Sequence, residues 1–294
     1  MYVLHIVNDK EWNDQSTEKE YITESFKKDG FIHCSDYNQI VRVAESNFAE
    51  KEKLTVLVID TEKLKSKLVY EDLYMLYEKY PHIYGKINKD SVSEIFVMEK
   101  DSEGKFFISD EIITLCTKSE IKLKNGKKLV MRSALVSDAE DMIDYFNHVA
   151  GETDNLTFGN GEFELSLEDE RNKIKQSNNS TAKIIYNGFT DGKLVANLTF
   201  TKPRRKRLSH KGEFGITVRK DYWNIGVARA MLNNLIENAK FTGNISKINL
   251  KVREDNLRAI KLYEKLGFQR EGTERRSFYI NGKFYDSEYM GLEI

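Results

Sequence analysis

The sequence predicts an α+β protein built from two domains. The chain has 294 residues, more than one hydrophobic core usually serves. Strand-like and helix-like segments occur together in the first half and alternate clearly in the second half. The stretch "TLCTKSE" (114–120) has the polar composition of a linker. We therefore expect one domain over residues 1–113 and a second over residues 120–294.

The composition limits the classes of partner. The formal net charge is −1 and the pI is about 6.6, which argues against general affinity for nucleic acids or anionic membranes. Cys34 and Cys116 lack metal-ligand spacing, so we expect no metal site and a reducing compartment. No export signal or long apolar run is visible. These features predict a cytoplasmic protein without a membrane span or a direct nucleic-acid partner.

Local patterns predict the elements of the N-terminal half. Runs of β-branched and aliphatic residues indicate strands, and an amphipathic period indicates one helix. In order, we expect a strand at 2–7, a helix at 37–48, and strands at "LTVLVID" (54–60), "SEIFVME" (93–99) and "KFFIS" (105–109).

The C-terminal half begins with a hairpin and two capped helices. In "IKLKNGKKLVMRSA" (121–134), Asn125 and Gly126 predict a tight turn in which both residues have positive φ. Asp138 is the expected cap of a helix that ends near Val149. Ser166, with Asp169 three residues later, is the expected start of another helix.

The rest of the chain reads as strands interrupted by two helices. We expect turns at the Asn-Gly and Asp-Gly pairs of "TAKIIYNGFTDGKLVANLTFT" (181–201) and a final hairpin on Asn281 and Gly282. The other expected elements are strands at 211–218, 245–252 and 267–273 and helices at 226–240 and 256–266.

The segment "YWNIGVARAML" (222–232) has an unusual helix start. Its first helical turn carries small or aliphatic residues around Gly226 and no carboxylate. Acidic side chains are normally favoured there by the helix dipole. This absence suggests that the positive end of the helix is kept free for the anion of a ligand.

Three blocks in this half resemble one enzyme superfamily. They are "GEFGITVRKDYWNIGVARAMLNNLIENAK", "INLKVREDNLRAIKLYEKLGFQREG" and "FYINGKFYDSEYM". Together they resemble the GNAT N-acetyltransferases, most of all the branch with spermidine and ribosomal-protein acetyltransferases. The resemblance implies a mixed, mostly antiparallel twisted sheet flanked by helices. It also implies transfer of an acetyl group from acetyl-CoA to a primary amine, by direct attack in a ternary complex.

The resemblance assigns residues to the acetyl-CoA site. The family holds pyrophosphate on a Gln/Arg-x-x-Gly-x-Gly/Ala loop, which Gly226, Val227 and Ala228 match. Trp223, Asn224 and Ile225 depart from that pattern, and Arg229 is a candidate replacement charge. The backbone of the preceding strand pairs with the pantetheine arm in relatives. The residues at those positions are Ile216, Thr217 and Val218.

The resemblance also suggests catalytic groups. Tyr263 matches the tyrosine that protonates the departing thiolate, and Asn256 matches an asparagine beside the cofactor. Glu213 is the preferred general base, with His210 as a weaker alternative. Some N-terminal acetyltransferases carry a glutamate where Lys251 stands here, so their mechanism does not transfer.

Two charged stretches leave the acceptor open. Carboxylates between the first two helices would attract a cationic amine or polyamine, whereas a basic loop would suit an acidic surface such as ribosomal RNA. Each stretch is equally compatible with a solvated loop. A ribosomal or other protein acceptor is one possibility, and the sequence indicates no oligomeric state. The acidic residues are Glu152, Asp154, Glu162 and Glu164, and the basic ones are Lys202, Arg204, Arg205, Lys206, Arg207 and Lys211.

The N-terminal half resembles an uncharacterised bacterial domain family, with a distant similarity to the ADP-ribosyltransferase fold. The resemblance rests on "GFIHCSDYNQIVRVAESNF", "LTVLVIDTEKL" and "YPHIYGKINKDSV". Its histidines and hydroxyl groups would suit a nucleotide or phosphate cleft, or would be structural groups of the core. The residues concerned are His5, His33, Ser35, His82 and Tyr84.

Two alternative functions follow from these features. In the first, the C-terminal half binds acyl-CoA without catalysis and regulates the N-terminal domain. In the second, the protein is bifunctional and its N-terminal domain acts on a nucleotide.

Overall fold

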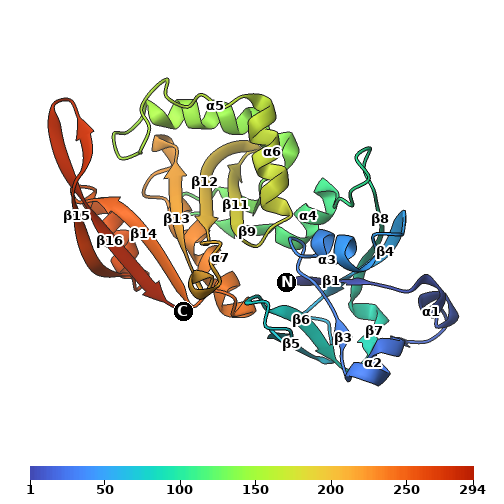
Figure 1. Cartoon of the computed structure of the whole chain (residues 1–294). Coiled ribbons are helices and arrows are strands. Elements are labelled where there is room, and N and C mark those ends of the chain that lie inside the picture. Colours follow the sequence, from blue (N-terminus) through green and yellow to red (C-terminus); the bar gives the residue numbers. More distant parts are fainter. The chain divides into compact units, whose positions relative to one another are not determined.

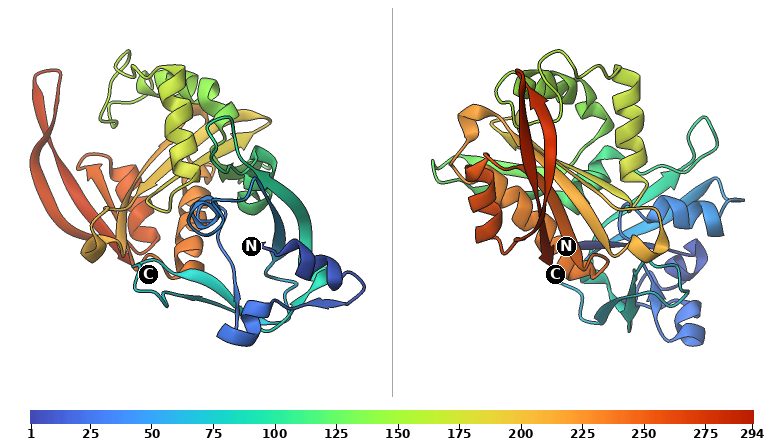
Figure 2. Two further views of the ribbon diagram at one scale, coloured as in Figure 1. Left: turned by 45° about the vertical axis from the view of Figure 1, so that its right-hand side comes forward. Right: turned by 60° about the vertical axis from the view of Figure 1, so that its left-hand side comes forward.

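A computed structural model describes all 294 residues and confirms the α+β class. The chain divides into two compact units, which are shown in Figures 1 and 2. Unit 1 comprises residues 1–117 and 178–181, and unit 2 comprises residues 118–177 and 182–294. None of the helices is long and apolar enough to cross a membrane.

Unit 1 contains three small sheets and four short helices. One antiparallel sheet has the strand order β1-β4-β8, a second joins β2 to β7, and a third has the order β3-β6-β5. The elements are β1 (Tyr2–Ile6), α1 (Asp9–Asp14), β2 (Glu20–Tyr21), α2 (Glu24–Asp29), β3 (Ile32–His33), α3 (Ile40–Asn47), β4 (Lys53–Asp60), β5 (Lys67–Glu71), β6 (Tyr80–Tyr84), β7 (Ile87–Asn88), β8 (Val92–Glu99) and α4 (Asp110–Thr117).

The core of unit 1 lies between these sheets. Val3 of β1 and Leu57 of β4 pack with Ile32 of β3 and Ile83 of β6, and all four side chains are fully buried. The apolar run in "LTVLVID" forms a strand whose residues 56–59 are all fully buried, as the sequence predicts.

Unit 2 is built on one eight-stranded sheet with the order β15-β16-β14-β13-β12-β11-β10-β9. All neighbours are antiparallel except β13 and β14. Its elements are β9 (Ser119–Lys122), β10 (Lys128–Ser133), α5 (Ala139–Ala150), α6 (Leu167–Asn178), β11 (Lys183–Thr190), β12 (Lys193–Thr201), β13 (Lys211–Val218), α7 (Val227–Thr242), β14 (Lys247–Arg253), α8 (Leu257–Lys265), β15 (Gln269–Ile280) and β16 (Lys283–Glu293). Four 3₁₀ turns complete the chain, at Lys89–Ser91, Val136–Asp138, Lys206–Leu208 and Lys220–Tyr222.

The sheet of unit 2 buries a separate core on each face. On one face, Met231 and Leu235 of α7 pack with Leu198 of β12 and Leu250 of β14. On the other, Met142 of α5 packs with Ile174 of α6 and Ile185 of β11. Figure 1 shows α5 and α6 on one side of the strands and the long β15–β16 hairpin extending away from them. This arrangement confirms the mixed, mostly antiparallel sheet flanked by helices.

Two expected turns differ from the structure. Only Gly126 of the Asn125-Gly126 pair has positive φ, because the loop is closed instead by the hydrogen bonds between Leu123 and Lys127 and between Gly126 and Leu123. Asn187 and Gly188 lie inside β11 rather than in a turn. The Asn187 amide is fully buried and donates to the Asp138 carboxylate at 3.1 Å, which holds it in the sheet.

Two further local expectations were wrong. Residues 105–109 form no strand, since Phe106 makes a single bridge to Lys100 and its N–H bonds to the Glu45 carboxylate. Asp138 precedes α5 but does not cap it. Its carboxylate instead receives both guanidinium donors of Arg132, at 2.6 and 2.7 Å.

Other local expectations were confirmed. Asp191 and Gly192 both have positive φ, as do Asn281 and Gly282, and each pair joins two strands. Ser166 Oγ accepts the Asp169 N–H at 3.1 Å and donates to its carboxylate at 2.6 Å, so this helix start follows from local chemistry.

Candidate functional site

The central feature of unit 2 is a fork between two parallel strands. β13 and β14 are paired at only three positions, of which the last joins Glu213 to Asn249. Beyond that point β13 remains paired with β12 as far as Val218, and β14 remains paired with β16. The edge of β13 that faces β14 is therefore left without a strand partner over residues 214–218.

The register decides which peptide groups face the fork. The Arg219 N–H bonds to the Val195 carbonyl at 2.9 Å, so residue 219 faces β12. In an antiparallel pair, every second residue points its N–H and C=O toward the same neighbouring strand. The peptide groups of Thr217, two residues before Arg219, therefore point to β12 as well. The peptide groups of Ile216 and Val218 then face the fork. Ile216 and Val218 therefore direct backbone groups toward a ligand in the fork, whereas Thr217, the third predicted strand residue, does not.

Trp223 covers part of this edge. Its indole N–H donates to the Val218 carbonyl at 2.7 Å. The guanidinium of Arg258, in the first turn of α8, lies 3.6 Å from the centre of the Trp223 ring. A cation over an indole face is electrostatically favourable. Trp223 thus stands where a Gln or Arg is expected, and an arginine from α8 lies against its ring.

The open end of the fork leads to the start of α7. Asn224 and Gly226 have φ values of 64° and 103°, and Gly226 receives no side-chain cap. The first turn of α7 has no acidic residue. An added Cβ on Gly226 would meet no atom within 4 Å, so the glycine serves the backbone conformation and not close packing. The result is an uncapped helix N-terminus, where N–H groups favour an anion.

The flanking residues of this loop have separate roles. The Ile225 carbonyl accepts from the Lys124 N–H at 3.1 Å, and its side chain packs against the core. Val227 is buried, Ala228 is partly exposed, and Arg229 projects to solvent. Arg229 is therefore placed to meet an anion only from the solvent side of the helix.

Tyr263 lies in α8 beside the fork. Its side chain is only 7% exposed, and its ring packs against Phe214 of β13 and Phe268, at centroid distances of 5.7 and 5.9 Å. Burial raises the pKa of the phenol to about 12, so the hydroxyl keeps its proton at neutral pH. The hydroxyl makes no hydrogen bond to another residue. A protonated donor is thus held next to the strand that lines the fork.

Glu213 lies at the closed end of the fork. Its side chain is exposed and lies on the sheet face opposite Phe214, which is buried in the core. Its cross-strand neighbours are Thr201 of β12 and Asn249 of β14. His210 is exposed and outside the fork, and its carbonyl accepts from the Ser246 N–H. The two candidate bases are therefore in different positions, and only Glu213 belongs to the fork.

Two other predicted positions have protein partners. Asn256 caps α8, with its side-chain oxygen accepting from the Ala259 N–H at 3.3 Å. Lys251 pairs with Glu274 at 2.6 Å, and the hydroxyl of Tyr289 donates to the same carboxylate. The position where some relatives carry a glutamate base is thus occupied here by an ion pair.

The acidic cluster is partly used within the protein. Glu152 accepts from His148 Nε2 at 3.0 Å and from the Lys220 N–H at 2.8 Å, so it anchors the turn that follows β13. Glu162 accepts from the Gly159 N–H at 2.8 Å. Asp154 is engaged through its carbonyl, which accepts from Arg253 at 2.6 Å, whereas Glu164 is exposed. Only part of this cluster remains to attract a cation.

The basic loop connects β12 to β13. Arg204, Arg205, Lys206 and Arg207 are exposed, while Lys202 and Lys211 are partly buried. The basic loop ends at Lys211, the first residue of β13, and therefore lies next to the closed end of the fork. The structure therefore separates this loop from the uncapped start of α7, which follows the opposite end of β13.

Arg258 and Tyr145 were missed by the sequence analysis. Tyr145 of α5 is fully buried, and its hydroxyl donates to Thr217 Oγ1 at 2.9 Å. Arg258 follows the capping Asn256 by two residues, which is a local signal that the sequence offered. Nothing local marks Tyr145, because its partner lies 72 residues away.

In unit 1, the predicted histidines fall into two environments. His5 is 6% exposed, and its Nδ1 donates to the His33 carbonyl at 2.8 Å. Burial lowers the pKa of His5 to about 4. Ser35 is buried and is bridged to Leu4 through backbone hydrogen bonds. These two residues are therefore part of the core.

His33 and His82 are cross-strand neighbours on β3 and β6, with ring centroids 5.3 Å apart. Glu71 accepts from His82 Nδ1 at 3.1 Å and from the Tyr84 hydroxyl at 2.5 Å. Burial lowers the pKa of His82, which favours the neutral imidazole. Glu71, which no sequence pattern marks, joins two of the predicted residues.

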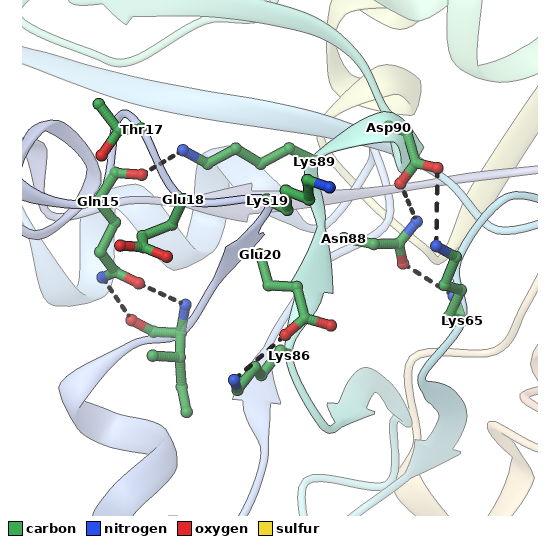
Figure 3. Close-up of a pocket in the computed structure, with 11 residues that line it drawn as sticks. Gln15, Thr17, Glu18, Lys19, Glu20, Lys65, Lys86, Asn88, Lys89 and Asp90 are labelled. Carbon is green, nitrogen blue, oxygen red and sulfur yellow. Dashed lines mark hydrogen bonds and ion pairs between the residues drawn. The ribbon is translucent and has the colours of Figure 1, made fainter.

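A surface pocket of unit 1 lies elsewhere. It is lined by residues of the α1–β2 connection, of β7 and of the 3₁₀ turn after β7, including Lys19, Asn88 and Lys89, as Figure 3 shows. Lys86 pairs with Glu20 at 3.2 Å, and Lys65 lies 3.9 Å from Asp90. None of the predicted histidines lines it, and the structure has no group of three or more metal-ligating side chains placed to hold an ion.

Comparison with known sequences separates the two halves. Residues 6–95 match the family "Protein of unknown function (DUF952)", and residues 152–268 match the "Acetyltransferase (GNAT) family". These findings support the uncharacterised N-terminal family but do not support the expected ADP-ribosyltransferase similarity.

Individual relatives match unit 2. The L-amino acid N-acetyltransferase AaaT of Escherichia coli is 40% identical over 100 residues, which are 34% of this chain and 62% of the relative. The spermidine N(1)-acetyltransferase of Vibrio cholerae is 32% identical over 83 residues, or 28% of this chain and 48% of the relative. The chain thus spans between about half and three fifths of the length of these curated relatives.

A solved structure covers the fold more completely. The acetyltransferase of GNAT family from Streptococcus pneumoniae is 33% identical, with a TM-score of 0.55. The match covers 56% of this chain and 99% of that protein.

Proposed function

The chain belongs to the GNAT acetyltransferase family, and on that premise we propose that it transfers an acetyl group from acetyl-CoA to a primary amine. The observation that carries the proposal is the fork between β13 and β14, which opens toward the uncapped start of α7. An extended arm can pair with the free edge of β13, and the anion attached to it can bind at the helix start.

The diphosphate of coenzyme A would bind to the N–H groups at the start of α7. Backbone donors and the helix dipole favour an anion there, and Gly226 allows the chain to turn with positive φ. Arg258, stacked on Trp223, would supply the side-chain N–H donors that relatives obtain from a Gln or Arg in the loop. Arg229 would contribute from the solvent side.

The pantetheine arm would pair with Ile216 and Val218. The Val218 carbonyl already accepts from Trp223, so the Val218 N–H and both peptide groups of Ile216 are the donors and acceptors left for the arm. One of these N–H groups would face the thioester oxygen, where negative charge develops. A well-aimed donor of this kind lowers the barrier by about 3–4 kcal/mol.

Proton transfers would be divided between Glu213 and Tyr263. The amine nitrogen forms a bond to the thioester carbon as Glu213 accepts a proton from it. The carbon–sulfur bond then breaks with its electron pair on sulfur, and Tyr263 gives a proton to that sulfur. The phenol regains its proton from solvent. Glu213 releases the proton it accepted to solvent, so both residues return to their starting state, and no acyl-enzyme is required.

The acceptor class is supported by the relatives and by charge. The names of the relatives given above refer to L-amino acids and to spermidine, and spermidine and nearly all L-amino acids carry a primary amino group. Glu213 and the exposed Glu164 would attract a cationic acceptor, and a protein N-terminus is also compatible with an open fork. We infer a small amine or a peptide N-terminus as the acceptor.

A thiol-release assay tests this proposal. Full-length protein is mixed with acetyl-CoA and a panel of acceptors: spermidine, the L-amino acids, kanamycin and alanyl-glycine amide. Release of coenzyme A above the rate without acceptor is the expected result, and mass spectrometry should show an acetylated amine. Tight acetyl-CoA binding by calorimetry, together with no release for any acceptor, would instead support a non-catalytic acyl-CoA sensor.

A further inference from the structure

The side chains at the last paired position of the fork share one face of the sheet. Glu213 and Asn249 are direct neighbours on the parallel strands β13 and β14. The residues that flank them, Phe214 and Ile248, are buried in the core on the opposite face. Because side chains alternate along a strand, Glu213 and Asn249 both project away from that core.

Asn249 has an unsatisfied amide. Its Oδ1 is buried and has no hydrogen-bond partner. Two other amides on the same face are fully engaged: Asn187 donates to Asp138 at 3.1 Å, and Asn197 donates to Asn187 at 2.9 Å. An unpaired buried acceptor is destabilising, and natural proteins usually keep one only where a ligand or a function requires it. The contrast marks Asn249 as a group that lacks its partner.

We propose that Asn249 orients the acceptor amine together with Glu213, an inference that rests on the proposed function. Neighbouring strands lie about 4.8 Å apart, so one nitrogen atom can reach both side chains. Glu213 accepts one amine proton, and the Asn249 amide, which is partly accessible as a whole, turns so that its Oδ1 accepts a hydrogen bond from the other N–H. The lone pair then points along the fork toward the thioester beside Ile216.

Two of the three lysines on this face of β13 and β14, Lys247 and Lys251, are held by other carboxylates, and Lys247 pairs with Glu271 at 2.6 Å. Lys251, two residues further along the same face of β14, is held by Glu274 at 2.6 Å. The Tyr289 hydroxyl donates to the same carboxylate. The pair formed by Glu213 and Asn249 is therefore left as the hydrogen-bond acceptor set at the closed end of the fork.

This arrangement selects for primary amines. A primary amine offers two N–H donors and a lone pair, which matches two acceptors and one electrophile. A secondary amine offers only one N–H and leaves either Glu213 or Asn249 without a partner. We expect wild-type kcat/KM to be about tenfold lower or more for an N-methylated acceptor, since an unpaired buried group costs at least one strong hydrogen bond.

The test compares two acceptors and four proteins. The acceptors are the most active primary amine of the panel and its N-methyl derivative. The proteins are wild type, Asn249→Leu, Asn249→Asp and the control Asn172→Leu, which removes an exposed amide from α6. Asn249→Leu should lower kcat/KM for the primary amine about tenfold and bring the ratio of the two acceptors close to one. Asn249→Asp keeps an oxygen acceptor and should retain the preference, as should the control.

Two results would overturn the inference. One is an Asn249→Leu variant that turns over with an unchanged ratio of primary to N-methylated acceptor. The other is a wild-type enzyme that uses both acceptors equally, a measurement that does not depend on any variant folding. A wild-type protein that releases no coenzyme A with any amine would refute the proposed function itself, and so is distinguishable from a failure of Asn249 alone.

Discussion

Replacing Tyr263 by phenylalanine should separate catalysis from stability. The Tyr263 side chain is 7% exposed and its hydroxyl has no hydrogen-bond partner in the protein, so removal of the hydroxyl leaves no other group unsatisfied. The ring keeps its contacts with Phe214 and Phe268. We expect the free energy of unfolding to change by no more than about 0.5 kcal/mol.

The effect on catalysis should be much larger. Burial holds the phenol pKa at about 12, so the donor is protonated throughout the neutral range. Loss of a general acid slows the chemical step by about a hundredfold, which corresponds to about 2.7 kcal/mol in the barrier. Initial rates of thiol release at saturating acetyl-CoA and acceptor measure kcat directly, and urea unfolding measures stability.

Tyr145→Phe is the matched control. It removes a buried tyrosine hydroxyl that does have a partner, Thr217 Oγ1. This variant should lose about 1 kcal/mol of stability with a smaller change in kcat. An unchanged kcat in Tyr263→Phe, or a loss that only follows a loss of folded protein, would refute the role assigned to Tyr263.

Three further changes probe the rest of the molecule. Gly226→Ala forces a side chain into positive φ without a steric clash, so it should cost about 1–2 kcal/mol of stability and weaken acetyl-CoA binding in calorimetry; an unchanged dissociation constant would contradict the proposed phosphate site. Arg258→Met keeps an apolar chain on Trp223 but removes the charge, and should raise the dissociation constant about tenfold at low salt, with a smaller effect at high salt. Burial lowers the pKa of His5 to about 4 in the folded protein, so the unfolded chain binds a proton at this residue more tightly than the folded chain does. The free energy of unfolding of unit 1 should therefore fall by about 2 kcal/mol as the pH falls from 7.5 to 5. Urea unfolding followed by Trp12 fluorescence in a Trp223→Phe background measures this loss, which should be absent in His5→Phe; the same pH dependence in that variant would assign it to another group.

Local chemistry explains why some elements could be predicted from the sequence. The cap formed by Ser166 and Asp169 joins residues three apart, and the turn at Asp191 and Gly192 requires only two residues that tolerate positive φ. The uncapped start of α7 belongs to the same class, because the residues around Gly226 decide it. Such features depend on neighbours in the chain and not on distant partners.

Tertiary contacts override local preferences elsewhere. Asn187 and Gly188 have the composition of a turn, but the buried hydrogen bond to Asp138 keeps them in β11. Asp138 has the position of a helix cap, but Arg132 binds its carboxylate. In both cases, a buried charged partner outweighs a turn or cap preference of about 1 kcal/mol.

The sequence by itself determined the class of the fold and the carboxylate-free start of α7 around Gly226, and it supplied the roles proposed for Glu213 and Tyr263. Only the tertiary structure decided that β13 and β14 separate after Glu213, that Thr217 faces β12, and that Asn249 has no partner. The physical reason is that strand register is set by hydrogen bonds between segments far apart in the chain. An unpaired edge arises where those bonds stop, and no local pattern records that point.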